Sequence, residues 1–136
     1  KESRAIAGLS MGGYGSFLYS LHHPDMFCAC APLSAAVFDD TVMEARKARS
    51  HKDLFNRLFG PGDEHWKQNN VLKILSDWDQ NNLPKIRYYI DCGDDDGLLD
   101  GNMQVHQIMR QKGIRHEFRV RDGGHSWTYW RLCRKS

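Results

Sequence analysis

One serine stands among glycines in a pattern typical of a reactive hydroxyl. The stretch GLSMG, residues 8–12, has the G-x-S-x-G spelling of a nucleophile elbow, a tight turn from strand to helix that exposes Ser10. Gly8 and Gly12 suit this turn, because strand and helix press together two residues before and two residues after the serine. The alternative is a glycine-rich turn with an incidental serine. A phosphate-binding loop is disfavoured, because the stretch lacks the P-loop lysine.

The residues that could activate Ser10 follow it in the order acid, then histidine. A serine hydroxyl is a poor nucleophile until a base takes its proton, and the base needs a third group to hold its tautomer. His125 is the candidate base, because the six other histidines precede the acidic cluster, lie in an expected helix or point with the apolar side of a strand. The candidate acids are Asp94, Asp95 and Asp96, and spacing alone does not decide among them. The order serine, acid, histidine is that of α/β-hydrolases.

The acidic cluster could also be a solvated turn or a calcium loop. An EF-hand template anchored on Gly97 requires an aspartate at position 92 and a glutamate at position 103. The chain has Cys92 and Met103 at these positions, so calcium lacks two ligands. We therefore expect no metal at this turn.

The elements that must position these residues alternate between strands and helices. This order predicts an α/β fold, a mostly parallel sheet of about four strands with helices on both faces, in which reactive residues gather at the carboxyl ends of strands. In the last strand, residues 114–121, apolar and charged residues alternate, which is typical of a sheet edge. The expected strands are Arg4–Ala7, Phe27–Leu33, Ile86–Cys92 and 114–121, and the expected helices are Tyr14–His22, Gly101–Lys112 and Trp127–Cys133. The intervening Asp39–Leu83 is a polar excursion with helical patches at Val42–Arg49 and Val71–Trp78.

Length and charge indicate one packed domain and argue against two classes of partner. The 136 residues are 40% hydrophobic and 26% charged, and the net charge is only +2. Without a basic patch interleaved with aromatic residues, nucleic-acid binding is not expected. The longest nearly apolar segment, residues 27–38, is too short to cross a bilayer, so we expect no membrane partner. The four cysteines lack the spacing of a metal site and read as buried thiols, which leaves the compartment open.

Four motifs together carry a family resemblance. AGLSMGGYGS, HPDMF, IDCGDDDGLL and GGHSWTYWR occur in this order and resemble the "putative esterase" family, which includes esterase D, feruloyl and acetyl-xylan esterases of carbohydrate esterase family 1, and mycolyltransferases. The likeness covers essentially the whole chain and is loosest in 39–83. It implies a single domain, 1–136, that forms the C-terminal half of an α/β-hydrolase. It also implies Ser10 as nucleophile, His125 as base and Asp96 as orienting acid, with Asp95 as second choice, and no cofactor.

The resemblance also implies a missing half. Family members begin with about four further strands, and a loop after one of them donates the second amide of the oxyanion hole. We therefore expect a fragment, or one chain of a pair, whose exposed strand edge near Arg4–Ala7 recruits a partner chain or a second copy. The isolated chain should hydrolyse aryl esters feebly, since losing one oxyanion donor costs about 10²-fold in rate.

The function expected from the resemblance is serine carboxylic ester hydrolysis through an acyl-enzyme, on feruloyl or acetyl esters of plant polysaccharide. The Met11 amide would help to hold the oxyanion, and 39–83 would form a lid-like roof over the substrate. Aromatic side chains that could line such a pocket are more often part of the hydrophobic core. Such an enzyme would be secreted or periplasmic. The alternatives are an acyltransferase of the mycolyltransferase type and a non-catalytic carbohydrate-binding or structural fragment. The candidate substrate-binding residues are Leu9, Phe38, Phe59, Trp66 and Trp127.

Overall fold

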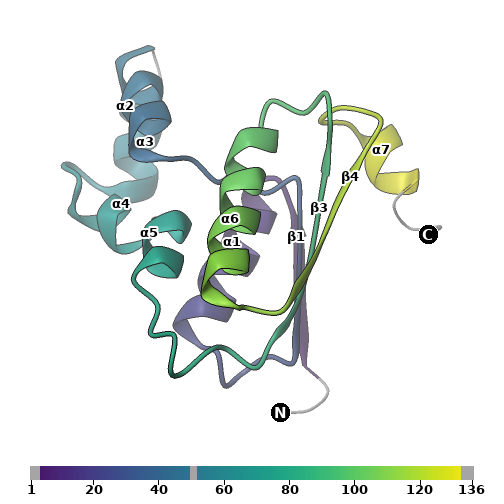
Figure 1. The fold of residues 1–136 in the computed structure, drawn as a ribbon. Coiled ribbons are helices and arrows are strands. Elements are labelled where there is room, and N and C mark those ends of the chain that lie inside the picture. The colour runs from purple at the N-terminus through teal and green to yellow at the C-terminus, as the bar shows by residue number, and fades with distance from the viewer. Residues whose placement is uncertain (1–3, 50–51, 133–136) are drawn as a thin grey trace.

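A four-stranded parallel sheet organises the chain. The computed structural model describes residues 4–49 and 52–132, and its strands follow the order β1-β2-β3-β4 (Figure 1). The predicted parallel sheet is confirmed, and the alternating strand β4 lies at one edge, as expected. The strands are β1 (Ala5–Leu9), β2 (Ala29–Leu33), β3 (Arg87–Gly93) and β4 (His116–Arg121).

Seven helices connect and flank these strands in the described part of the chain. Three of them match predicted helices closely, namely α1 (Met11–His22), α6 (Leu99–Lys112) and α7 (Trp127–Leu132). Helix α1 begins three residues earlier than predicted, directly after Ser10, and Cys133, the predicted end of the last helix, lies outside the described residues. The remaining helices are α2 (Asp40–Arg49), α3 (Lys52–Phe59), α4 (Glu64–Gln68) and α5 (Val71–Ser76).

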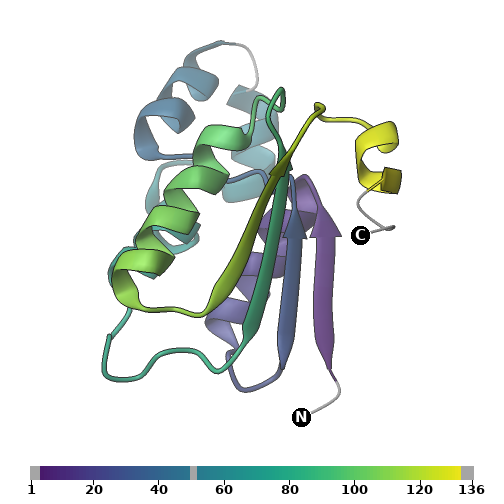
Figure 2. The same ribbon diagram turned by 45° about the vertical axis from the view of Figure 1, so that its right-hand side comes forward.

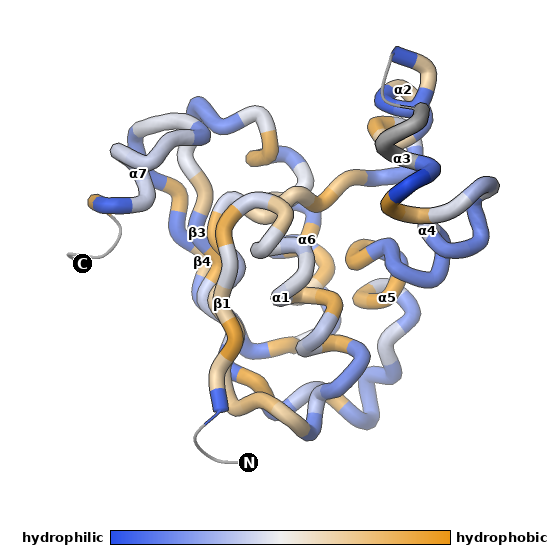
Figure 3. Tube along the Cα trace, turned by 180° about the vertical axis from the view of Figure 1, so that it is seen from behind, coloured by the Kyte–Doolittle hydropathy of each residue, from blue (hydrophilic) through white to orange (hydrophobic). Residues whose placement is uncertain are grey.

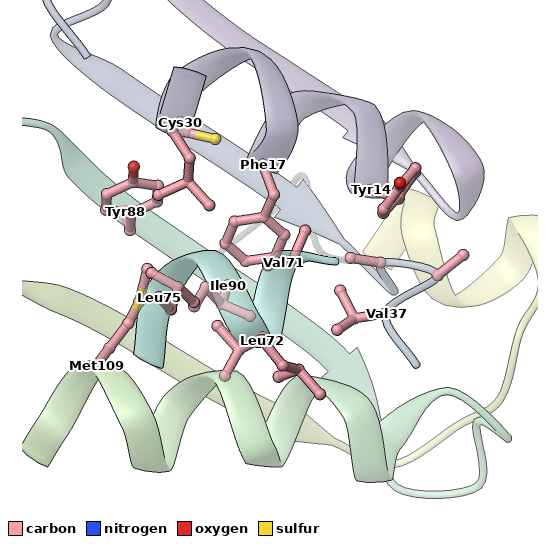
Figure 4. Packing of buried hydrophobic residues seen from close by; sticks show 14 of the residues in the cluster. Tyr14, Phe17, Cys30, Val37, Val71, Leu72, Leu75, Tyr88, Ile90 and Met109 are labelled. Carbon is pink, nitrogen blue, oxygen red and sulfur yellow. The ribbon is translucent and has the colours of Figure 1, made fainter. Parts of the chain in front are cut away.

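The helices cover the two faces of the sheet unequally. Helices α1 and α6 lie against one face and α5 packs on both of them, whereas α7 lies on the opposite side of the sheet near the carboxyl ends of the strands (Figures 1 and 2). The core fills the first of these interfaces, where Phe17 of α1 stacks on Tyr88 of β3 with ring centroids 6.1 Å apart (Figure 4). Its fully buried aliphatic members come from α5, β3 and α6 and include Val71, Leu75, Ile90, Val105 and Met109.

The excursion between β2 and β3 is not wholly peripheral. Met43, Trp66 and Leu75 belong to the main core cluster, and α5 packs against both α1 and α6. Hydropathy follows this arrangement, with apolar stretches along β1 and in α5 (Figure 3). The apolar part of the excursion therefore completes the helical layer over the sheet, and its other helices extend outward from it.

No helix in residues 4–49 and 52–132 is both long and apolar enough to cross a membrane.

Candidate active site

Ser10 occupies a sharp turn at the carboxyl end of β1. Its dihedral angles are φ 55° and ψ −117°, a conformation that side chains other than glycine rarely adopt and that costs about 1–3 kcal/mol. The surrounding backbone holds this strain, because the Ser10 amide donates to Leu33 O at 2.9 Å and the Ser10 carbonyl accepts from the amides of Tyr14 and Ala36. The turn therefore places Ser10 and its hydroxyl directly before the first residue of α1.

Two glycines allow the turn to close, and they are not quite the expected pair. A Cβ on Gly8 would lie 2.2 Å from the carbonyl oxygen of Gly12, so strand and helix touch at this position. A Cβ on Gly12 would meet nothing within 4 Å among the described residues, so the expectation that Gly12 needs the same absence of a side chain is wrong here. The second tight position is Gly13, whose Cβ would lie 2.9 Å from Ala35 Cα.

Ser10, His125 and Asp96 form a row of hydrogen bonds across three strand ends. His125 Nε2 lies 3.0 Å from Ser10 Oγ, and His125 Nδ1 lies 2.9 Å from Asp96 Oδ2. An ionised carboxylate only accepts hydrogen bonds, so Nδ1 carries the proton and Nε2 presents its lone pair to the serine. The Asp96 side chain is 1% exposed and that of His125 is 37% exposed, so the row runs from the protein interior to the surface.

The turn that carries Asp96 is built by its own side chain. Asp96 Oδ1 accepts a hydrogen bond of 2.9 Å from the Leu98 amide, which leaves Oδ2 for His125. Asp95 is exposed, and the Asp95 amide donates to Gly123 O at 3.1 Å. Of the aspartates that spacing left open, Asp96 is the one whose carboxylate contacts the imidazole.

The acid turn and the histidine loop are in direct backbone contact. A Cβ on Gly93 would lie 1.9 Å from Gly123 O, so the two segments can approach only because residue 93 has no side chain. The Gly123 amide donates to Asp94 Oδ1 at 2.9 Å, and the Asp94 amide donates to Arg121 O at 2.9 Å. These contacts fix the separation between the acid and the base.

One group of carboxylates in the described residues has metal-like spacing. Oxygens of Asp94, Asp95 and Asp122 all lie within 4.8 Å of one another, and the three residues are exposed. Because Asp94 accepts the Gly123 amide, the group is part of the contact between the two loops, and we assign it no metal.

Two residues were not foreseen from the sequence: Trp130, which contacts the His125 ring, and Ser34, which bonds Trp130. The Trp130 ring meets the imidazole edge to face, with centroids 4.8 Å apart, and its indole N–H donates to Ser34 Oγ at 3.0 Å. Ser34 is fully buried at the carboxyl end of β2 and has a φ of 43°. The position of Trp130, one helical turn after Trp127 and five residues after His125, was the only available signal.

The candidate wall residues occupy different environments. Trp66 is only 4% exposed and packs in the core, with its indole N–H 3.2 Å from Asp40 Oδ1, so as a pocket wall it is corrected to a core residue. Phe59 is partly buried and packs edge-on against Trp66, with ring centroids 5.6 Å apart. Trp127 is 65% exposed and contacts Trp130 at 5.3 Å, which leaves it beside the site.

Leu9, Met11 and Phe38 complete the predicted set. Leu9 and Met11 flank the serine in the chain, and Met11 is 49% exposed. Phe38 is partly buried, and the Arg46 guanidinium lies over its ring at 4.1 Å. The Met11 amide stands at the positive end of the α1 dipole, where backbone N–H groups stabilise a developing negative charge.

A buried thiol lies behind the acid. Cys92 is fully buried, and its burial, followed by the negative charge of Asp96, raises the pKa of the thiol to about 12. It is therefore protonated at neutral pH and is a poor nucleophile in this site.

Comparison with known proteins gives a family for this constellation. Residues 1–133 match the model of the family described as "Putative esterase". The chain belongs to this esterase family. An acetyl esterase from Caldicellulosiruptor saccharolyticus is 30% identical over 139 residues, which cover 96% of this chain and 51% of that protein. The chain therefore spans about half the length of this curated relative.

Solved structures agree with this membership. A ferulic acid esterase superposes with a TM-score of 0.74 at 38% identity, covering 97% of this chain and 48% of that one. A fluorophosphonate-binding serine hydrolase of Staphylococcus aureus superposes with a TM-score of 0.80 at 24% identity, covering 98% and 52%, and this likeness concerns the fold alone. The fold is thus that of the α/β-hydrolases, and the chain spans about half the length of these two structures.

Proposed function

We propose that this chain carries the catalytic residues of a serine carboxylic ester hydrolase. The observation that carries the proposal is the hydrogen-bonded row of Ser10, His125 and Asp96 at the carboxyl edge of a parallel sheet. Membership of an esterase family supports the reaction class. A strained serine at a strand-to-helix turn is costly to maintain, which favours a chemical role over an incidental one.

The reaction follows from the geometry. Ser10 Oγ attacks the ester carbonyl carbon while His125 Nε2 takes the hydroxyl proton, and the Met11 amide donates to the resulting oxyanion. The imidazolium then protonates the leaving alcohol, which yields an acyl-serine. Water then attacks the acyl carbon while His125 Nε2 takes its proton. The imidazolium returns this proton to Ser10 Oγ as the carboxylic acid leaves, so Ser10 and neutral His125 are regenerated. Asp96 remains ionised throughout and stabilises the imidazolium.

For the substrate, we propose an acetyl or feruloyl ester of a plant polysaccharide. The relatives named acetyl esterase and ferulic acid esterase support this choice. Trp127 is the candidate wall for the acyl or sugar group, because it is exposed and lies one ring away from the imidazole. We further propose that segment 39–83 forms a lid of the same domain. Helix α5 would anchor this lid in the core, and helices α2, α3 and α4 would form its outer part.

For the partner, we propose that the outer edge of β1 pairs with further strand structure, from a partner chain or from a second copy. In the described residues β1 is hydrogen-bonded on one side only, to β2. Unpaired strand edges readily add another strand, because their backbone groups still need partners.

The reaction class is tested by ester hydrolysis with matched serine variants. Wild-type protein, Ser10→Ala and Ser76→Ala are compared on 4-nitrophenyl acetate and on methyl ferulate. Ser76 is the control, because its hydroxyl bonds Leu72 O on α5, away from the site. Ser10→Ala should lower kcat about 10⁴-fold or more, whereas Ser76→Ala should match the wild type. Equal hydrolysis by all three proteins would remove the proposal.

A further inference from the structure

A second buried carboxylate, Asp91, lies outside the Ser10–His125–Asp96 row. It is fully buried in β3, and among the described residues its carboxylate oxygens accept hydrogen bonds from the side chains of Tyr129, Arg121 and Tyr89. Tyr129 OH donates to Oδ1 at 2.5 Å, the Arg121 guanidinium pairs with Oδ2, and Tyr89 OH donates to Oδ2 at 3.2 Å. A carboxylate without water is costly unless such donors surround it, so their arrangement around Asp91 is a specific one.

The two main donors stand at opposite ends of the loop that carries His125. Arg121 is the last residue of β4, four residues before His125, and Tyr129 lies in α7, four residues after it. The histidine loop therefore starts and finishes on the same buried carboxylate. Asp91 also lies in the strand that leads into the Asp96 turn, so one strand carries both the acid and this anchor.

Helix α7 connects the anchor to the imidazole itself. Trp130 follows Tyr129 directly, and its ring contacts the His125 ring edge to face at 4.8 Å. The Trp130 indole N–H donates to Ser34 Oγ, and the Ser34 amide donates to Asp91 O at 2.7 Å. A displacement of Tyr129 from Asp91 would thus move the Trp130 ring, against which the imidazole rests.

We propose that Asp91 is a positioning residue which, through Tyr129 and the α7 helix, holds His125 in the orientation that bonds both Ser10 and Asp96. The inference rests on the proposed function. A purely structural role would make the cluster a stabilising ion pair with no consequence for the imidazole. Buried ion pairs often add little stability over an apolar replacement, so stability alone is a weak reason for this one.

The test removes one hydroxyl, in the variant Tyr129→Phe, which keeps the ring. The matched control is Tyr88→Phe, which also removes one buried hydroxyl from a tyrosine. Tyr88 lies in β3, as Asp91 does, but its hydroxyl is in the main core, 3.3 Å from Ser20 Oγ. Three quantities are measured on the protein: the rate of labelling by a fluorophosphonate, kcat and KM for 4-nitrophenyl acetate, and the downfield proton resonance of His125 Nδ1–H.

Tyr129→Phe should lower the labelling rate and kcat about 10-fold or more with KM unchanged, because a small displacement of a catalytic group costs up to about 10²-fold in rate. The His125 resonance should shift upfield or broaden. Tyr88→Phe should leave all three within twofold of wild type. Unchanged labelling and an unchanged resonance in folded Tyr129→Phe would overturn the proposal.

A second variant decides if Tyr129→Phe does not fold. Ser34→Ala removes the acceptor of the Trp130 indole. The same decrease in kcat and the same change in the His125 resonance are expected, and an unchanged kcat with an unchanged resonance would overturn the proposal. Failure of the proposed function would look different: wild-type protein would not be labelled at all, while the His125 Nδ1–H resonance would still report on the hydrogen bond to Asp96 and would still change in Tyr129→Phe.

Discussion

The close approach of β1 and α1 at Gly8 makes a quantitative prediction about the turn that exposes Ser10. In Gly8→Ala the new methyl would overlap the Gly12 carbonyl oxygen at 2.2 Å and the Gly12 carbonyl carbon at 2.3 Å. Both are backbone atoms, so no side chain can rotate away and strand and helix must separate. Overpacking of this kind costs typically 1–3 kcal/mol and more where backbone must move, so we expect a loss of about 3 kcal/mol or more.

Gly12→Ala is the matched control, with the same chemical change on the other side of the serine. Its methyl would meet nothing within 4 Å in the described residues, and residue 12 is in the first turn of α1. Alanine is favoured over glycine within a helix by up to about 1 kcal/mol, so Gly12→Ala should be neutral or slightly stabilising.

The assay is urea unfolding followed by circular dichroism, with thermal unfolding as a second measurement. Gly8→Ala should lower Tm by roughly 10 °C, whereas Gly12→Ala should leave it equal or higher. The reasoning would be refuted if Gly8→Ala unfolded at the wild-type urea concentration. It would also be refuted if both variants lost the same stability, because the loss would then not come from the contact at Gly8.

Three further predictions concern a cap, a thiol and a histidine. The Asn70 side chain accepts hydrogen bonds from the amides of the second and third residues of α5, at 3.0 and 3.4 Å. In urea unfolding, Asn70→Ala should therefore cost about 1–2 kcal/mol of stability and Asn70→Ser clearly less. Equal losses in the two variants would contradict the capping role. Burial raises the pKa of Cys92 to about 12, whereas Cys28 is half-buried. Iodoacetamide at pH 8 should therefore alkylate Cys28 of the native protein well before Cys92, as measured by peptide mass spectrometry. Equal rates at the two thiols would contradict the burial of Cys92. The pKa of His106 is lowered below its ordinary value of 6.5, first by burial and then by the charges of His116 and Arg110. The unfolded chain therefore binds more protons than the folded one, and the free energy of unfolding falls as the pH decreases below about 6.5. His106→Gln should reduce this loss between pH 7.5 and 5.5, and an unchanged pH dependence would show that His106 does not cause it.

The local patterns of the sequence predicted the sheet well. Period-two alternation identified β4 as an edge strand, and the glycine-flanked serine marked the end of β1, because both signals depend on neighbouring residues alone. The placing of Asp96 and His125 at strand ends follows from the general rule that parallel strands end at one edge of a sheet. Their separation of 2.9 Å additionally needs the contact between Gly93 and Gly123, which only the register of β3 and β4 brings about.

What could not be predicted depends on contacts between distant segments. Nothing in the spacing of the sequence paired Asp91 with Tyr129, which follows it 38 residues later. Trp66 was a candidate pocket wall because aromatic residues suit both pockets and cores, and its burial against Phe59 is decided by how the excursion folds back. The same applies to Gly12 and Gly13, since both are helical and only packing against Ala35 distinguishes them.

The central claim is that Ser10, His125 and Asp96 act together as nucleophile, base and orienting acid, and the most direct test is to map a fluorophosphonate adduct by peptide mass spectrometry. We predict a single adduct on the Ser10 peptide in wild-type protein, none in Ser10→Ala, and labelling at least about 10²-fold slower in His125→Gln and Asp96→Asn, since the hydroxyl then lacks an oriented base. An adduct on another serine, or labelling of Ser10 at the wild-type rate in both of those variants, would contradict the account.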